Sequence, residues 1–139
     1  MADYIDSLQQ EIADYTGPYL DQLQWLPKLH NFFLALYEDP RLHRQGRMMC
    51  NAAIAYILLP FDIIPETSMG TFGYIDDLYL AAEVLQHLQQ DNSLGNLLDD
   101  IWPEERLIGS VVAELLTKCG EALDEDDRRS ILQLSGLGD

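Results

Sequence analysis

The sequence predicts an all-α fold, and three observations lead to this expectation. Apolar residues recur at three- and four-residue spacing from one end of the 139-residue chain to the other. Strand-like alternation with β-branched enrichment is nowhere sustained. The prolines stand at or near the boundaries between helical patterns. Because the length is that of one domain, we expect a single helical bundle over residues 1–139.

The first 39 residues predict three helices separated by glycine or proline. Gly17 ends the first helix, and Pro18 opens the second. Pro27 ends this short second helix and begins the third. The apolar stripes of the three helices consist of Ile5, Leu8, Ile12 and Tyr15, then Leu20 and Leu23, then Leu29, Phe32, Phe33 and Leu36. These helices flank the central part of the chain and are expected to share its core.

Residues 40–90 predict an antiparallel helical hairpin, the centre of the bundle. Asp39 is the expected N-cap of its first helix, Pro40 takes the first helical position, and the helix runs to about Leu59. The returning helix covers residues 73–90, and its inner face carries Leu78, Ala82, Leu85 and Leu88. Small residues on both helices would allow a close approach of the axes, and these are Ala52, Ala53, Ala55, Ala81 and Ala82.

Residues 92–139 predict three further helices that flank the hairpin. The first is short and ends before Pro103, which opens a longer helix that ends near Gly120. Asp124 is the expected N-cap of the last helix, and Gly136 is its stop. The apolar stripes of the first two consist of Leu94, Leu97, Leu98 and Ile101, then Leu107, Ile108, Val111, Val112 and Leu115.

The corner of the hairpin reads "LLPFDIIPE" at residues 58–66, and "GYIDD" follows at 73–77. Over Asn51–Leu85, about a quarter of the chain, this pattern resembles the bacterial YkvA-like family, a domain of unknown function. Its signature is a helix, a Pro-x-Asp-Leu-Ile-Pro-Asp corner, a glycine and an Asp-Asp pair that opens a second helix. The residues that match are Pro60, Asp62, Pro65, Glu66, Gly73, Asp76 and Asp77. The resemblance implies a helical hairpin and no reaction. The turn here lacks the third proline of most relatives and is one residue longer, which shifts Gly73 and the acid pair relative to the corner.

A structural role accounts for every acid of the corner. Pro60 and Pro65 exclude a continued helix, so a rigid turn lies between them. Asp62 is placed to accept backbone N–H groups in that turn. Asp76 and Asp77 stand at the start of the returning helix, where carboxylates cap free N–H groups. We therefore favour a structural function for the acids.

The alternative is a divalent-cation site. Asp62, Glu66, Asp76 and Asp77 would gather four carboxylates at one end of the hairpin, and calcium or magnesium prefers such oxygen ligands. A metal-dependent enzyme would need this site, and no other cofactor is indicated. Cys50 and Cys119 fit buried positions in apolar helices, and the chain shows no zinc, phosphate-loop or Ser-His-Asp motif. The sequence favours a non-enzymatic module in a reducing cytoplasm.

Charge is the strongest compositional signal. The chain has 24 acidic and 8 basic side chains, a formal net charge of -16, which opposes direct binding to nucleic acid. A basic protein partner fits better. We therefore predict a protein-interaction or regulatory module, and the alternative is an acidic inhibitor of a basic, nucleic-acid-binding protein.

Three arginines form a basic segment at the start of the predicted hairpin. Arg41, Arg44 and Arg47 are predicted to lie on a solvated face, where Arg47 pairs with Glu83 of the returning helix. The alternative is that they anchor an apolar hairpin at the cytoplasmic leaflet of a membrane. No spanning helix is predicted, because the longest uncharged stretch, residues 48–61, is too short. Of the aromatic residues, Trp25 and Trp102 are among the candidates for interface anchors, although helical aromatics usually belong to a core.

Overall fold

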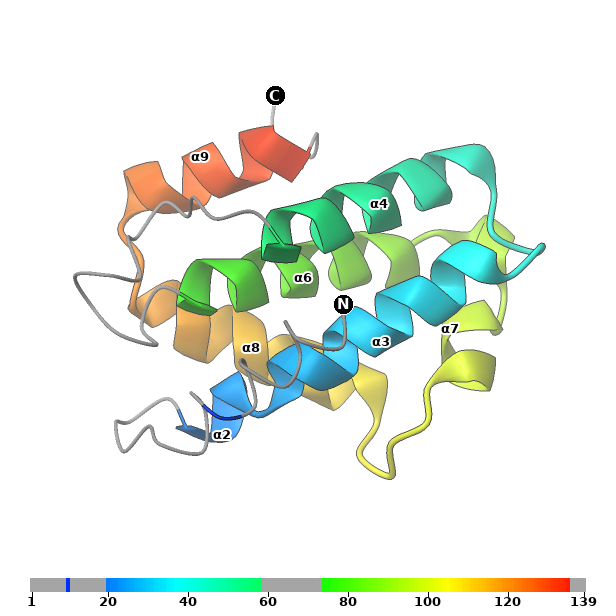
Figure 1. Ribbon diagram of the computed structural model, residues 1–139, viewed down its shortest axis with the longest axis horizontal. Coiled ribbons are helices and arrows are strands. Elements are labelled where there is room, and N and C mark those ends of the chain that lie inside the picture. The colour runs from blue at the N-terminus through cyan, green and yellow to red at the C-terminus, as the bar shows by residue number, and fades with distance from the viewer. Residues whose placement is uncertain (1–9, 11–19, 59–73, 136–139) are drawn as a thin grey trace.

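The computed structural model describes residue 10 and residues 20–58 and 74–135, and this part of the chain is helical throughout its regular structure (Figure 1). The elements are α2 (Leu20–Leu23), α3 (Trp25–Glu38), α4 (Arg44–Leu58), α6 (Tyr74–Gln89), the 3₁₀ turn η2 (Asn92–Leu94), α7 (Leu97–Ile101), α8 (Ile108–Glu121) and α9 (Glu125–Ser135). The prediction of an all-α bundle is confirmed. The first predicted helix, the corner and the stop at Gly136 lie outside the described residues.

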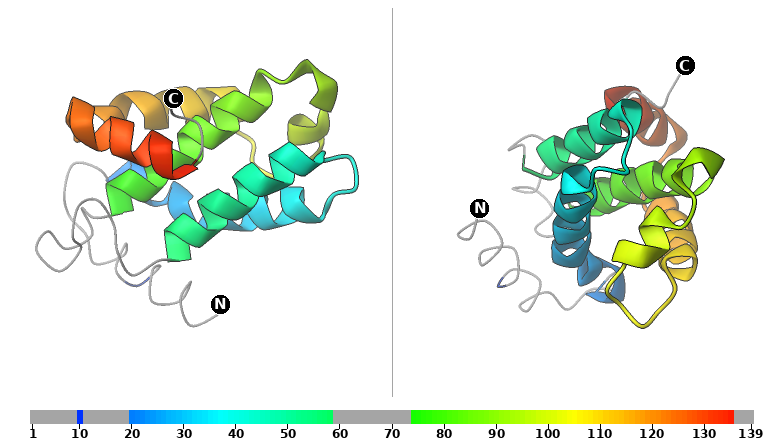
Figure 2. Two further views of the ribbon diagram at one scale, coloured as in Figure 1. Left: turned by 90° about the horizontal axis from the view of Figure 1, so that it is seen from above. Right: turned by 90° about the vertical axis from the view of Figure 1, so that its right-hand side faces the viewer.

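Helix α6 is the centre of the bundle. It contacts α2, α3, α4, α8 and α9, and Figure 2 shows it between α4 on one side and α8 on the other. Every residue from Ile75 to Ala82 is buried, so the first half of α6 is enclosed on all sides. A helix without a polar face is typical of a core position. The four predicted inner residues, Leu78, Ala82, Leu85 and Leu88, are all buried as expected.

The antiparallel hairpin of α4 and α6 is present, and α3 runs antiparallel to α4 on its other side (Figure 1). Leu29, Phe33 and Leu36 of α3 are buried against this pair, in agreement with the predicted stripe. Of the small residues on α4, Ala53 is buried but Ala55 is exposed. Ala55 therefore does not bring the helix axes together.

The predicted start of α4 is wrong. The helix begins at Arg44, and Asp39 instead accepts the backbone N–H of Arg41 at 2.8 Å, which closes a turn around Pro40. The cap of α4 is His43, whose Nδ1 accepts the backbone N–H of Gly46 at 2.9 Å. A Cβ atom at Gly46 would lie 2.5 Å from Leu42 Cδ1, so any other residue in this first turn would require the buried Leu42 side chain to shift.

The predicted start of α8 at Pro103 is also wrong. Residues 102–107, here called the α7–α8 connection, are irregular, and α8 begins at Ile108. The indole Nε1 of Trp102 donates to the carbonyl of Arg106 at 2.7 Å, which holds the connection in a loop. Leu107, which the sequence assigned to the apolar stripe, is 75% exposed as a result.

The joint between α8 and α9 follows the prediction. Asp124 Oδ1 accepts the backbone N–H of Asp127 at 2.8 Å, so Asp124 is the N-cap of α9. Arg128 then reaches back and donates to the carbonyls of Gly120 and Leu123. A cation bound to the final carbonyls of α8 compensates the negative end of its dipole. The two contacts fix the return of α9 along the bundle.

Candidate functional site

The acid pair of the hairpin lies in the first turn of α6. Asp76 and Asp77 are both 0% exposed, and Asp76 Oδ1 accepts the backbone N–H of Asp77 at 2.9 Å. Asp76 therefore lies inside the helix and bonds to the backbone of its first turn, where a carboxylate also interacts favourably with the helix dipole. Within residues 20–58 and 74–135, no group of three or more His, Cys, Asp or Glu side chains is arranged to hold a metal ion.

The other residues of the corner motif, Pro60, Asp62, Pro65, Glu66 and Gly73, lie outside the described residues. The four-carboxylate cation site therefore stays a prediction.

The basic segment is not a free cationic face. Arg41 pairs with Asp39 at 3.1 Å and with Asp100 of α7 at 2.8 Å. Arg47 donates to two backbone carbonyls, those of Leu42 at 3.1 Å and Asp39 at 3.3 Å. Only Arg44 of the three arginines is exposed without a partner in the described part of the chain.

The predicted ion pair between Arg47 and Glu83 is wrong. Arg47 is committed to the backbone carbonyls of the turn before α4, whereas Glu83 hydrogen-bonds with Tyr79 one turn earlier on α6. That bond, together with burial as the main cause, raises the pKa of Tyr79 to about 12. The axial level of two residues on packed helices can be derived from helix length, but the rotation of each helix cannot.

A polar contact joins the start of α4 to the end of α6. His43 Nε2 lies 2.7 Å from Asp91 Oδ2, and Asp91 Oδ1 accepts both the hydroxyl of Ser93 at 2.6 Å and its backbone N–H at 3.0 Å. The hydrogen bonds from Ser93, followed by the contact with His43, lower the pKa of Asp91 to about 2. His43 thus caps α4 through one ring nitrogen and reaches Asp91 through the other.

Internal contacts use most of the positive charge. Six of the eight basic side chains are bound within the chain, namely Lys28, Arg41, Arg47, Arg106, Arg128 and Arg129. Among the described residues, five exposed acids make neither an ion pair with these side chains nor a helix-capping hydrogen bond, namely Asp21, Glu38, Asp99, Glu105 and Glu121. These five are called the unpaired acids below. The described surface therefore carries its negative charge largely without compensation.

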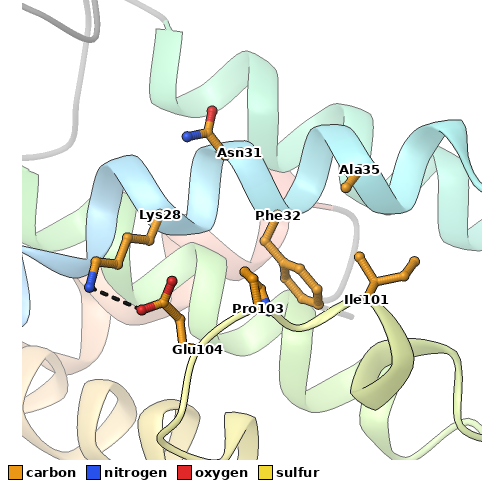
Figure 3. Close-up of a pocket in the computed structure, with 7 residues that line it drawn as sticks. All are labelled: Lys28, Asn31, Phe32, Ala35, Ile101, Pro103 and Glu104. Carbon is orange, nitrogen blue, oxygen red and sulfur yellow. Dashed lines mark hydrogen bonds and ion pairs between the residues drawn. The ribbon is translucent and has the colours of Figure 1, made fainter.

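A pocket of about 170 Å³ lies between α3 and the segment that leads from α7 into the α7–α8 connection (Figure 3). Its lining is Lys28, Asn31, Phe32, Ala35, Ile101, Pro103 and Glu104. Lys28 Nζ and Glu104 Oε1 form an ion pair of 3.1 Å beside the opening. Sequence analysis missed this pocket, although the stretch "DDIWPEE", with two acids on each side of three apolar residues, was a signal that could have indicated it.

Phe32, one of the residues that line the pocket, belongs to a cluster of aromatic contacts. Trp102 packs edge-on against Phe32 at 4.9 Å between ring centroids and stacks on Trp25 at 5.8 Å. Lys28 Nζ lies 4.8 Å from the ring centroid of Trp25, within the range of a cation–π contact. Both tryptophans are half-buried. Each packs against the core with one part and is exposed to solvent with another, so neither the core position nor the surface position considered from the sequence applies alone.

The two cysteines are poor nucleophiles. Cys50 and Cys119 are fully buried, and burial raises the pKa of each thiol to about 12. A thiol attacks as the thiolate, which is scarce at neutral pH when the pKa is that high. Their role is packing in the core.

Comparison with known proteins finds one family model that matches the hairpin. Residues 47–82 match the family model described as a protein of unknown function (DUF1232). The match covers most of α4, the corner and the first half of α6, which is the region of the predicted YkvA-like resemblance. The chain is also 26% identical over 97 residues to "Uncharacterized protein ORF9" of Methanothermobacter thermautotrophicus. That alignment covers 70% of this chain and 66% of the relative, so the chain spans just under two thirds of the relative's length. No solved structure matches the chain at a significant level.

The DUF1232 segment, residues 47–82, contains the core of the hairpin and not the pocket. The pocket residues come from α3, α7 and the α7–α8 connection, and the unpaired acids also lie outside the segment. Over the described residues, none of the helices has the length and apolar character that a bilayer crossing requires. The family therefore indicates a scaffold, and the surface features must be interpreted from their own chemistry.

Proposed function

We propose that this chain is a non-enzymatic interaction module whose acidic surface binds a basic protein partner. The observation that carries the proposal is the allocation of charge. With a formal net charge of -16, the chain uses six of its eight basic side chains for internal contacts, and the five unpaired acids remain exposed. Such a surface attracts cationic partners over long range and repels nucleic acid and anionic lipid.

The internal contacts of the basic side chains also support an interaction role over a catalytic one. Arg41 links the turn before α4 to α7, Arg106 pairs with Glu114 at 2.7 Å, and Arg128 joins α8 to α9. These side chains connect helices and are not directed into the pocket. The two buried thiols, with raised pKa values, are likewise unsuited to nucleophilic chemistry.

The test is affinity capture from an extract of the native host, followed by quantitative binding of the captured partner at low and high salt. We expect a basic protein whose affinity falls as salt rises, because screening weakens attraction between exposed charges. Neutralising the unpaired acids together should remove most of the binding, and the changes are Asp21→Asn, Glu38→Gln, Asp99→Asn, Glu105→Gln and Glu121→Gln.

A matched control neutralises exposed charges of the opposite sign. Arg44→Gln combined with Lys118→Gln alters the two basic side chains that form no hydrogen bond or ion pair with the described residues. This variant should bind the partner as tightly as the unmodified chain, or more tightly. A partner with an acidic or neutral surface, or an affinity that neither salt nor the neutralised acids change, would contradict the proposal. If the partner binds nucleic acid and this chain competes for that site, the module is an inhibitor.

A further inference from the structure

We infer that the pocket between α3 and the α7–α8 connection binds one apolar side chain of a basic segment on the partner protein. The inference rests on the proposed function and assigns the site at which the partner is anchored. The pocket offers four apolar lining residues, Phe32, Ala35, Ile101 and Pro103. Its volume of about 170 Å³ is that of a small organic group, since cavities near 150 Å³ hold a benzene ring. One leucine, methionine or phenylalanine side chain fits this space.

The pocket is built on side chains that are already fixed. Phe32 is only 2% exposed and packs edge-on against Trp102. Trp102 is held in turn by its stacking on Trp25 and by its hydrogen bond to the carbonyl of Arg106. A partner side chain therefore enters a site whose walls need little ordering, which lowers the entropic cost of binding.

The charges around the pocket select the kind of segment that brings the apolar side chain. Four of the seven residues from Asp99 to Glu105 are acids, and Ile101, Pro103 and Glu104 of this stretch line the pocket. Asp99 and Glu105 make no ion pair with any described residue. A lysine or arginine beside the apolar anchor gains a carboxylate partner here, whereas an acidic neighbour would be repelled.

The rim has a cation that a partner can replace. Lys28 is half-exposed and pairs with Glu104, whose side chain is 28% exposed. A guanidinium from the partner forms a planar, two-bonded contact with a carboxylate that an ammonium group cannot form. The geometry thus suits an arginine next to the apolar anchor. A second copy of this chain is a poor occupant, because two molecules that each carry a net charge of -16 repel one another.

The experiment uses short synthetic peptides and the full chain. The first peptide has a central leucine flanked by arginines and lysines, the second replaces the leucine with alanine, and the third replaces the basic residues with glutamates. Binding is followed by intrinsic fluorescence, because the only tryptophans of the chain, Trp25 and Trp102, are a stacked pair that contacts Phe32 of the pocket through Trp102. We expect the first peptide to change this fluorescence and to bind at least about tenfold more tightly than each of the others.

Two matched variants test the position of the site. Ala35→Leu adds a helix-compatible side chain at a residue that lines the pocket, whereas Ala113→Leu makes the same change at an exposed position of α8. Ala35→Leu should weaken binding of the leucine peptide about tenfold, so that the chain no longer binds this peptide more tightly than the alanine peptide. Ala113→Leu should change neither property, and circular dichroism shows that both variants fold.

The outcomes separate this inference from the proposed function. If the leucine and alanine peptides bind equally, or if Ala35→Leu has no effect while neutralising the unpaired acids still weakens binding, the pocket inference is wrong and the acidic-surface proposal stands. Equal binding of the glutamate peptide would overturn the basic nature of the segment. If no basic peptide binds and the captured partner is also insensitive to salt, both proposals fail.

Discussion

Helix α6 and the α7–α8 connection use the same residue types in opposite ways. In α6, Asp76 and Asp77 are fully buried inside a helix that is enclosed on all sides over its first half. Around the connection, Asp99 and Glu105 are exposed and flank apolar residues that line a pocket. Acidic side chains thus have different surroundings, and different roles, in these two regions. In the core, Asp76 bonds to the backbone in the first turn of α6, and at the surface the proposed role of Asp99 and Glu105 is to provide charge for a partner.

The difference also explains what the family match can and cannot indicate. The DUF1232 segment, residues 47–82, supplies the hairpin around which the other helices pack. The pocket and the unpaired acids come from parts of the chain that the match does not cover. A shared hairpin therefore predicts a shared scaffold, whereas the partner can differ from one relative to another.

The largest effect should come from removing apolar volume at the centre of α6. Leu78→Ala empties a site that is 0% exposed, and such changes cost about 2–5 kcal/mol of unfolding free energy. Leu107→Ala in the α7–α8 connection is the control, because this side chain is 75% exposed and should cost no more than about 0.5 kcal/mol. Urea denaturation followed by circular dichroism measures both. Equal losses would show that α6 is not the centre of the core.

An intermediate effect should distinguish the buried acids from the exposed ones. Asp76→Ala removes the oxygen that accepts the Asp77 N–H and should cost about 0.5–2 kcal/mol, the usual range for a lost side-chain bond to an N–H group at a helix start. Asp76→Asn keeps an acceptor at this place and should recover part of the loss. Asp99→Asn on the exposed face should leave the denaturation midpoint unchanged. If Asp76→Ala were as harmless as Asp99→Asn, this role of Asp76 would be rejected.

The smallest effect concerns Asp91, which lies between these two regions. Its contacts with Ser93 and His43 lower its pKa from 3.8 to about 2 in the folded chain. A lowered carboxyl pKa gives stability that is fully present above pH 4 and is lost as the pH falls toward 2. Asp91→Asn should therefore lose less stability than the unmodified chain when melting temperatures at pH 4 and pH 2 are compared. An identical acid sensitivity of the two proteins would contradict this account.

Much of the fold could be predicted from the sequence, because the spacing of apolar residues along a long helix is visible without knowledge of what the helix packs against. The returning helix was expected at residues 73–90 and is found at Tyr74–Gln89. Asp124 was correctly identified as a cap because its side chain bonds to an N–H only three residues away. Such features need no knowledge of the tertiary structure.

The errors in the predicted helix boundaries arose where the same local sequence can form either a helix start or a turn. Asp39 followed by Pro40 is typical of a helix start, but the carboxylate of Asp39 closes a turn with Arg41 instead. Pro103 is likewise compatible with a helix start or with a loop. The hydrogen bond from the Trp102 indole to the Arg106 carbonyl stabilises the loop. The pocket was not predicted, because the stretch "DDIWPEE" indicates only one of its two sides, and its ion pair joins Lys28 and Glu104 across 76 positions of sequence.

The position of α6 has a consequence for synthesis on the ribosome. Its buried surface is completed by α3 and α4, which precede it, and by α8 and α9, which follow it. When residue 89 leaves the exit tunnel, the partners on one side of α6 have not been made, so its apolar side chains remain open to chaperones or to aggregation. A fragment limited to residues 47–82 would have the same open surface permanently. In this chain, the matched segment therefore depends on the helices before and after it to cover its apolar surface.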